Sequence, residues 1–211
     1  MRTDDLINLL SKDARVQIRF DYVFLAVLGL GVVFSSLLLL STIGIRKNMA
    51  DMIETPRVLF KLSLTLLLAV TATRLAFRIG KPGLSLRSAT LSLILPLAIA
   101  LIGMAAELFV VPKSDWSSSM MGHYSAFCLL FVPTLSIAPL AAILYSILQG
   151  APENPGLAGA VAGLAAGGIA AAIYAWHCPD DSPLFLATWY SIAVMIATAA
   201  GFLLGRRMLR W

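Results

Sequence analysis

Two cysteines and two histidines are the side chains of this chain best suited to chemistry, and they occur as two close pairs. His123 lies shortly before Cys128, and His177 directly precedes Cys178. Thiolate and imidazole bind soft and borderline metals, and two of each can form a tetrahedral site. The two thiols can instead form a disulfide where their Cα atoms come within about 7 Å. The third interpretation is four ordinary residues, because neither spacing matches an established zinc motif.

Long apolar runs must position these residues. The chain has 211 residues, of which 59% are hydrophobic and 13% charged. A helix needs about 20 mostly apolar residues to cross the hydrocarbon core of a bilayer. Runs of this kind cover 22–45, 58–77, 89–111, 126–148, 156–175 and 184–204. We therefore expect an all-α, polytopic integral membrane protein, a bundle of six transmembrane helices with no sizeable soluble domain.

Basic residues divide unequally between the two ends of the predicted bundle. If the N-terminus is cytoplasmic, eleven of the 16 lysines and arginines fall on the cytoplasmic side. Basic residues favour that side of a membrane. We expect an amphipathic cytoplasmic segment over 1–21, a membrane domain over 22–205 and a basic cytoplasmic tail over 206–211. Both histidines and both cysteines then share the opposite face. The orientation in the membrane accounts for the basic residues and therefore for the net charge of +5. The charge then does not indicate binding to nucleic acid, and we expect no direct contact with it.

The N-terminal segment has the pattern of a short amphipathic helix. Thr3 can cap it, and acidic residues in its first turn suit the positive end of the helix dipole. Such a helix either lies on the membrane surface or inserts its apolar side into a groove of a soluble partner. The residues expected to contact such a partner are Thr3, Asp4, Asp5, Leu6, Leu9 and Leu10.

Glycines follow one face of the fifth predicted span. Gly159, Gly163 and Gly167 recur at steps of four. Small faces allow helix backbones to approach closely inside a membrane. We expect this stripe to pack against another helix of the same chain, with a dimer contact as the alternative.

Three stretches of the chain resemble the NrsF-type negative regulators of sigma F. They are the start Met-Arg-Thr-Asp-Asp-Leu-Ile (1–7), the stretch Trp-His-Cys-Pro-Asp-Asp-Ser-Pro-Leu-Phe (176–185) followed by Thr-Trp-Tyr (188–190), and the end Gly-Arg-Arg-Met-Leu-Arg-Trp (205–211). The resemblance covers nearly the whole chain, and the His-Cys-Pro-Asp-Asp-Ser-Pro stretch is its most specific part.

The resemblance implies a six-span protein of the bacterial inner membrane that acts as an anti-sigma factor and not as an enzyme. Its partner would be a sigma factor of the extracytoplasmic-function class. The two characteristic cysteines of the family correspond to Cys128 and Cys178. The sigma factor would be held until these cysteines, with His123 and His177 as further candidates, sense a redox or metal signal. No resident cofactor is implied, and a transient metal ion at the cysteines is the alternative to oxidation.

Three other classes of function remain open from the residues themselves. A thiol-redox membrane enzyme usually presents a C-x-x-C pair, which neither cysteine has. A small transporter needs polar groups near the midplane, where these spans are apolar; Glu107 lies nearer the outer end, within expected reach of water. A purely structural membrane subunit is the third alternative.

Overall fold

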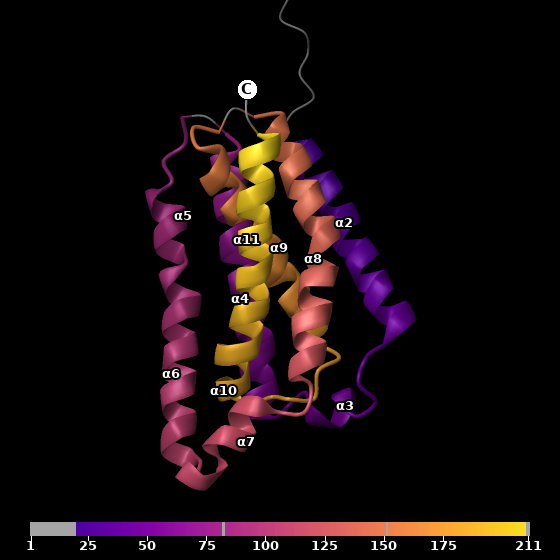
Figure 1. Ribbon diagram of the computed structural model, residues 1–211, viewed down its shortest axis with the longest axis vertical. Helices are drawn as coiled ribbons and strands as arrows, with labels where there is room; N and C mark the ends of the chain where they lie inside the picture. Colours follow the sequence, from indigo (N-terminus) through magenta and orange to yellow (C-terminus); the bar gives the residue numbers. More distant parts are fainter. Residues whose placement is uncertain (1–19, 82, 151, 210–211) are drawn as a thin grey trace, which may run out of the picture.

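The computed structural model describes residues 20–81, 83–150 and 152–209, which form helices and connections without strands (Figure 1). The all-helical prediction is confirmed for this part of the chain. The predicted partner contacts from Thr3 to Leu10 lie outside it.

Six helical segments are long and apolar enough to cross a membrane, as the sequence predicts. Shorter elements, α3 (Met49–Met52) and η1 (Lys113–Asp115), lie in the connections. The six segments are α2 (Phe20–Thr42); α4 (Pro56–Ile79); α5 (Arg87–Ser92) with α6 (Ile94–Val110); α7 (Trp116–Met121) with α8 (Ser125–Leu148); α9 (Pro155–Tyr174); and α10 (Pro183–Phe185), η2 (Leu186–Tyr190) and α11 (Ser191–Met208).

Local sequence explains where several helices begin. Proline occupies the first turn of α4, α9 and α10, where its missing N–H group needs no partner. Asn154 caps α9 by accepting a hydrogen bond from the Leu157 amide at 3.0 Å. The last helix continues to Met208, so Arg206 and Arg207 lie in its final turn. Cations at that position suit the negative end of the helix dipole.

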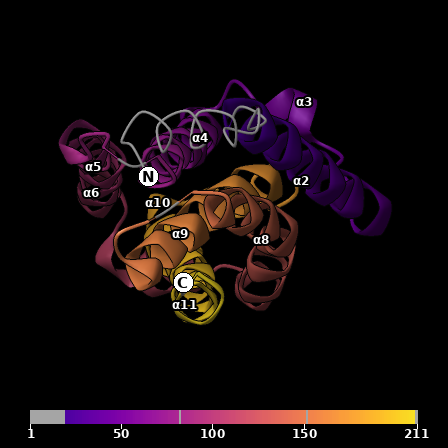
Figure 2. The ribbon, with the colours of Figure 1, turned by 90° about the horizontal axis from the view of Figure 1, so that it is seen from above.

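The α9 helix lies at the centre and packs against α2, α4, α8 and α11 (Figure 2). Its glycine stripe faces α11 of the same chain. A Cβ atom built on Gly159 would lie 2.2 Å from the Gly201 carbonyl oxygen, and one on Gly163 would lie 2.3 Å from that of Ala197. At Gly167 the approach is looser, 3.2 Å to the Ala197 Cβ. The structure therefore uses the stripe for packing within the chain.

The alternating direction of the helices gives the bundle two distinct ends, at the top and the bottom of Figure 1. We call one the basic end, where α2 and α9 begin and α4, α8 and α11 end. We call the other the cysteine end, where α3, α7 and α10 lie and where α9 leads into the connection 175–182. One apolar cluster, which includes Phe24 and Ile147, joins α2, α4, α8 and α9. A second cluster contains both cysteines.

Candidate functional site

The two cysteines lie in one buried cluster at the cysteine end. Cys128 belongs to the first turn of α8, whereas Cys178 lies in the connection between α9 and α10. Both thiols are free, and both residues have no exposed surface. Tyr174, Phe185 and Tyr190 pack in the same cluster. The predicted convergence of the two cysteines is therefore present in the structure, although their thiols are shielded from water.

The surroundings of Cys178 favour the thiol over the thiolate. Burial raises the pKa of Cys178 above its ordinary value, and the neighbouring Lys61 ammonium offsets part of that rise. Because the thiolate is the reactive form of cysteine, this arrangement keeps Cys178 poorly reactive at neutral pH. A reagent must first gain access to the cluster.

The two histidines take different positions. The His177 Nδ1 atom lies 2.9 Å from the Gly44 carbonyl oxygen, which fixes its ring against the end of α2. His123 is exposed, with Nδ1 3.7 Å from a carboxylate oxygen of Asp180. In the described part of the chain, no three His, Cys, Asp or Glu side chains are grouped as metal ligands. The structure thus does not form the four-ligand site that the residue types allow.

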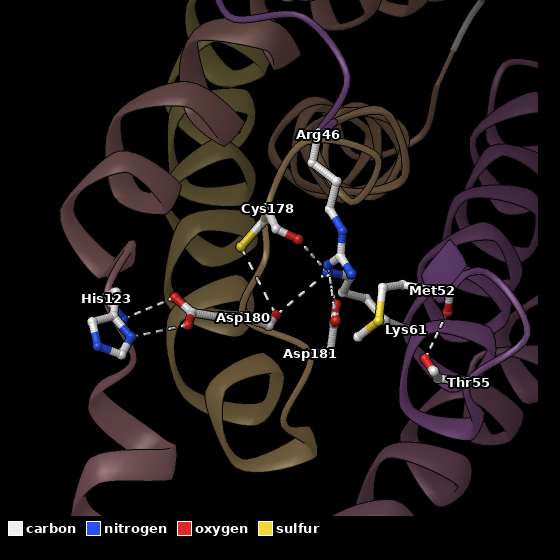
Figure 3. A network of polar contacts seen from close by, with 8 residues as sticks. All are labelled: Arg46, Met52, Thr55, Lys61, His123, Cys178, Asp180 and Asp181. Atoms are coloured by element: carbon white, nitrogen blue, oxygen red, sulfur yellow. Dashed lines mark hydrogen bonds and ion pairs between the residues drawn. The ribbon is translucent and has the colours of Figure 1, made fainter. Parts of the chain in front are cut away.

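A buried lysine organises the connection that carries Cys178 (Figure 3). Lys61, on α4, is fully buried, and its ammonium donates to the Cys178 carbonyl oxygen at 2.6 Å. It also forms an ion pair with Asp181. Arg46, from the connection after α2, donates to the other Asp181 oxygen at 2.9 Å. Two buried cations therefore share one carboxylate, and they join α2 and α4 to the backbone of Cys178.

Asp180 links the same connection to the start of α8. Its Oδ2 atom accepts hydrogen bonds from the His123 and Tyr124 amides at 3.0 and 2.8 Å. Gly122, at φ +59°, allows this approach, because a Cβ atom there would lie 2.7 Å from that oxygen. The left-handed conformation also favours glycine. Asp180 therefore positions the helix turn that presents Cys128.

Glu107 is a third acidic group at this end. Its Oε1 atom lies 2.9 Å from an Arg57 guanidinium nitrogen and accepts a hydrogen bond from the Ser182 hydroxyl at 3.2 Å. The Glu107 side chain is only 7% exposed. The expectation that Glu107 reaches water is therefore wrong. It instead joins α6 to α4 and to the residue that caps α10.

Two tyrosines complete the surroundings of the thiols. The hydroxyl groups of Tyr174 and Tyr190 are buried and have no hydrogen-bond partner in the described part of the chain. A single turn of π-helix, η2, ends at Tyr190. Such turns often mark functional sites, since they displace one side chain from the regular helix face. Tyr190 is 4% exposed, so its ring lies inside the bundle.

Sequence reasoning missed Lys61 as a residue of this site. One signal was available: Lys61 lies within the apolar α4, one helical turn before Thr65 and on the same buried face as Val58. Buried lysine is uncommon unless it is paired. Its partner, Asp181, lies 120 residues away in the chain, so the spacing of residues could not identify the pair.

Comparison with known protein families gives one match over nearly all of the chain. The family described as "Negative regulator of sigma F" matches residues 10–211. "Probable anti-sigma-F factor NrsF" of Azospira oryzae is 30% identical over 213 aligned residues, and the alignment covers 100% of both chains. "Anti-sigma-F factor NrsF" of Caulobacter vibrioides is 31% identical, again over 100% of both chains. No solved structure matches this chain.

Proposed function

Because this chain belongs to the NrsF family, the negative regulators of sigma F, we propose that it holds a sigma factor at a membrane and releases it when Cys128 and Cys178 react. The sequence resemblance supports a sigma factor of the extracytoplasmic-function class as the partner. The observation that carries the sensing proposal is the placement of both cysteines in one cluster at the cysteine end of the bundle.

The proposed location is the bacterial inner membrane, with the basic end in the cytoplasm. Six apolar helices of sufficient length support the membrane, and the distribution of basic residues supports the orientation. The sigma factor then meets the basic end, where we place the contact residues of the N-terminal segment, from Thr3 to Leu10. The cysteine end faces the periplasm, where thiol oxidation is favoured.

The buried ion pairs supply a route from the thiols to the helices. Cys178 shares its connection with Asp180, which positions the start of α8, and with Asp181, which binds Lys61 and Arg46. A change at either sulfur that displaces this connection therefore acts on α2, α4 and α8 together. All three helices reach the basic end, where α2 begins and α4 and α8 end. The switch requires two arrangements that differ by a few kcal/mol.

In one form of the signal, a peroxide oxidises the two thiols to a disulfide. One thiolate attacks a peroxide oxygen, forms a sulfenic acid and releases water after proton transfer. The second thiol can then displace water from that sulfenic acid to form a disulfide. The two thiols lose two electrons and two protons in total, and one peroxide becomes two waters. A metal ion held between the two thiolates is the alternative signal.

Cysteine-to-serine substitution tests the sensing step. Oxidation of the wild-type protein is expected to weaken sigma-factor binding about tenfold, within the usual range of coupling free energies. The Cys128→Ser/Cys178→Ser variant is expected to bind equally well in reductant and in peroxide, because neither hydroxyl can be oxidised in this way. The measurement is co-purification of the sigma factor with the full-length protein in detergent, with peroxide in one arm and Zn²⁺ in another.

Two comparisons make that assay decisive. Deletion of residues 1–14 should abolish sigma-factor binding in every arm, and each single serine variant reports which thiol is required. Release from the double-serine variant at the wild-type level would exclude sensing by these cysteines. Turnover of a dithiol substrate by the purified protein would instead favour the thiol-redox enzyme.

Engineered surface cysteines test the orientation. In the double-serine background, Ser114→Cys lies at the cysteine end and Ser85→Cys at the basic end, and both positions are exposed. A membrane-impermeant maleimide is expected to label Ser114→Cys in intact cells and Ser85→Cys only after the inner membrane is opened. The reverse pattern would show that the protein has the opposite orientation.

A further inference from the structure

A groove on the side of the bundle has one cation in a mostly apolar lining. The groove lies between α2, α4 and α9 and has a volume of about 760 Å³. Leu25, Leu40 and Val70 line it and are more than half exposed, so it opens sideways. In a membrane-spanning bundle, a lateral opening faces lipid and not water.

The packing of α2 explains why this groove exists. The helix is held mainly by α8: the Ser35 hydroxyl donates to the Leu135 carbonyl oxygen at 2.7 Å, and a Cβ on Gly31 would lie 3.1 Å from the Ala138 oxygen. Toward α4, the Phe24 and Phe77 rings are 5.2 Å apart near the basic end. From there α2 leans away from the bundle toward the cysteine end (Figure 1).

Arg74 is the charged residue of the lining. It is exposed and lies five residues before the end of α4, about 7.5 Å from the basic end at 1.5 Å per residue. Within the described ranges, its guanidinium has no ion-pair or hydrogen-bond partner. An arginine this close to the end of a span can extend to the phosphate level of a bilayer. The planar guanidinium can donate two parallel N–H hydrogen bonds to a phosphate group.

Other cations at this end favour a ligand with net negative charge. Arg78 follows Arg74 by one turn, and Lys81 follows Gly80, the residue that caps the end of α4. Lys81 pairs with Asp21, at the start of α2, so the cations exceed the anions beside the groove. A zwitterionic headgroup brings its own ammonium into this positive region, whereas an anionic headgroup does not.

We propose that the groove binds an anionic phospholipid, with its phosphate on Arg74 and one acyl chain between α2 and α4. This inference rests on the proposed membrane location, but not on sigma-factor binding or on the cysteines. Apart from Arg74 and the hydroxyl groups of Ser36 and Thr73, the groove lining is apolar, which suits the acyl chain of a lipid with one polar end. Such a lipid fills the space that separates α2 from α4.

Native mass spectrometry of the detergent-solubilised protein tests the site. Phosphatidylglycerol and phosphatidylcholine with identical acyl chains are added in equal amounts. The wild-type protein is expected to retain about fivefold more phosphatidylglycerol, the ratio that one basic residue near a membrane surface supplies. Arg74→Leu should bring the ratio close to one, whereas Arg74→Lys should retain most of the preference. Ala172→Phe, which fills the lining, should reduce the retention of both lipids.

Arg207→Leu is the matched control, because Arg207 is an exposed arginine at the same end but outside the groove lining. It should keep the wild-type ratio. Equal retention of both lipids by the wild-type protein, or an unchanged ratio in Arg74→Leu, would overturn the proposal. Recovery of each variant from the membrane fraction and its helical circular dichroism are scored separately. Failure of the membrane location is therefore distinguishable from failure of the lipid site.

Discussion

Replacing Asp181 by alanine is expected to lower the free energy of unfolding by about 3–5 kcal/mol, because the substitution leaves two buried cations without their shared carboxylate. The Lys61 side chain is 1% exposed and that of Arg46 is 6% exposed, so water cannot replace the lost partner. Thermal unfolding of the detergent-solubilised protein, followed by helical circular dichroism, measures the loss.

A second variant separates loss of charge balance from loss of packing. Asp181→Ala/Lys61→Met removes one cation together with the carboxylate and should recover part of the lost stability, since contacting groups are coupled in a double-mutant cycle. Asp115→Ala, an exposed carboxylate of η1, should change the free energy of unfolding by less than about 0.5 kcal/mol. If Asp181→Ala melts like the Asp115 control, the buried ion pairs do not stabilise the fold.

Replacing Gly159 by valine is expected to destabilise the protein by about 3 kcal/mol, as overpacking at a close contact does. The Cβ of any side chain at Gly159 would lie 2.2 Å from the Gly201 carbonyl oxygen and 2.7 Å from the Gly205 Cα. Both are backbone atoms, so only a separation of α9 from α11 can relieve the clash. The measurement is again thermal unfolding in detergent.

Gly29→Val provides the control for that substitution. Gly29 lies in the middle of α2, and a Cβ atom there meets nothing within 4 Å. The substitution therefore makes the same change in helix propensity as Gly159→Val, but without a steric clash. Gly201→Val should resemble Gly159→Val, because its Cβ would lie 2.3 Å from the Gly159 carbonyl oxygen. Equal stability of the Gly159 and Gly29 variants would mean that α9 and α11 are not in close contact.

The spans and the glycine stripe could be predicted because both depend on local patterns. An apolar run of about 20 residues has few alternatives to a membrane helix, and glycines at steps of four must share a helix face. The limits of the spans are predicted less well: the predicted start at 58 is Pro56 in the structure, and the predicted end at 204 is Met208. Helix ends depend on caps and neighbours as well as on hydropathy.

The polar part of the cysteine end could be predicted only in part. The order of the spans places Cys128 and Cys178 at one end, since alternate connections must lie on the same side. It does not indicate that Lys61 turns inward, or that Glu107 meets Arg57. Those pairings depend on how helices distant in the chain approach one another, and a charged residue near a span end is equally compatible with exposure to water. The connection 175–182, which the resemblance identifies as specific, proves to be the segment that most of these pairs contact.

The backbone contact between α9 and α11 limits which parts of the bundle can shift. Where Gly159 and Gly201 touch through their main chains, no layer of side chains remains that could rearrange, so the two helices must be displaced as one body. The α4 helix also approaches α9 closely, because a Cβ atom built on Gly168 would lie 3.1 Å from the Ala69 main chain. Under the proposed function, a disturbance at the thiols would therefore move α9 and α11 together, and any change in helix packing would fall to the helices around that pair.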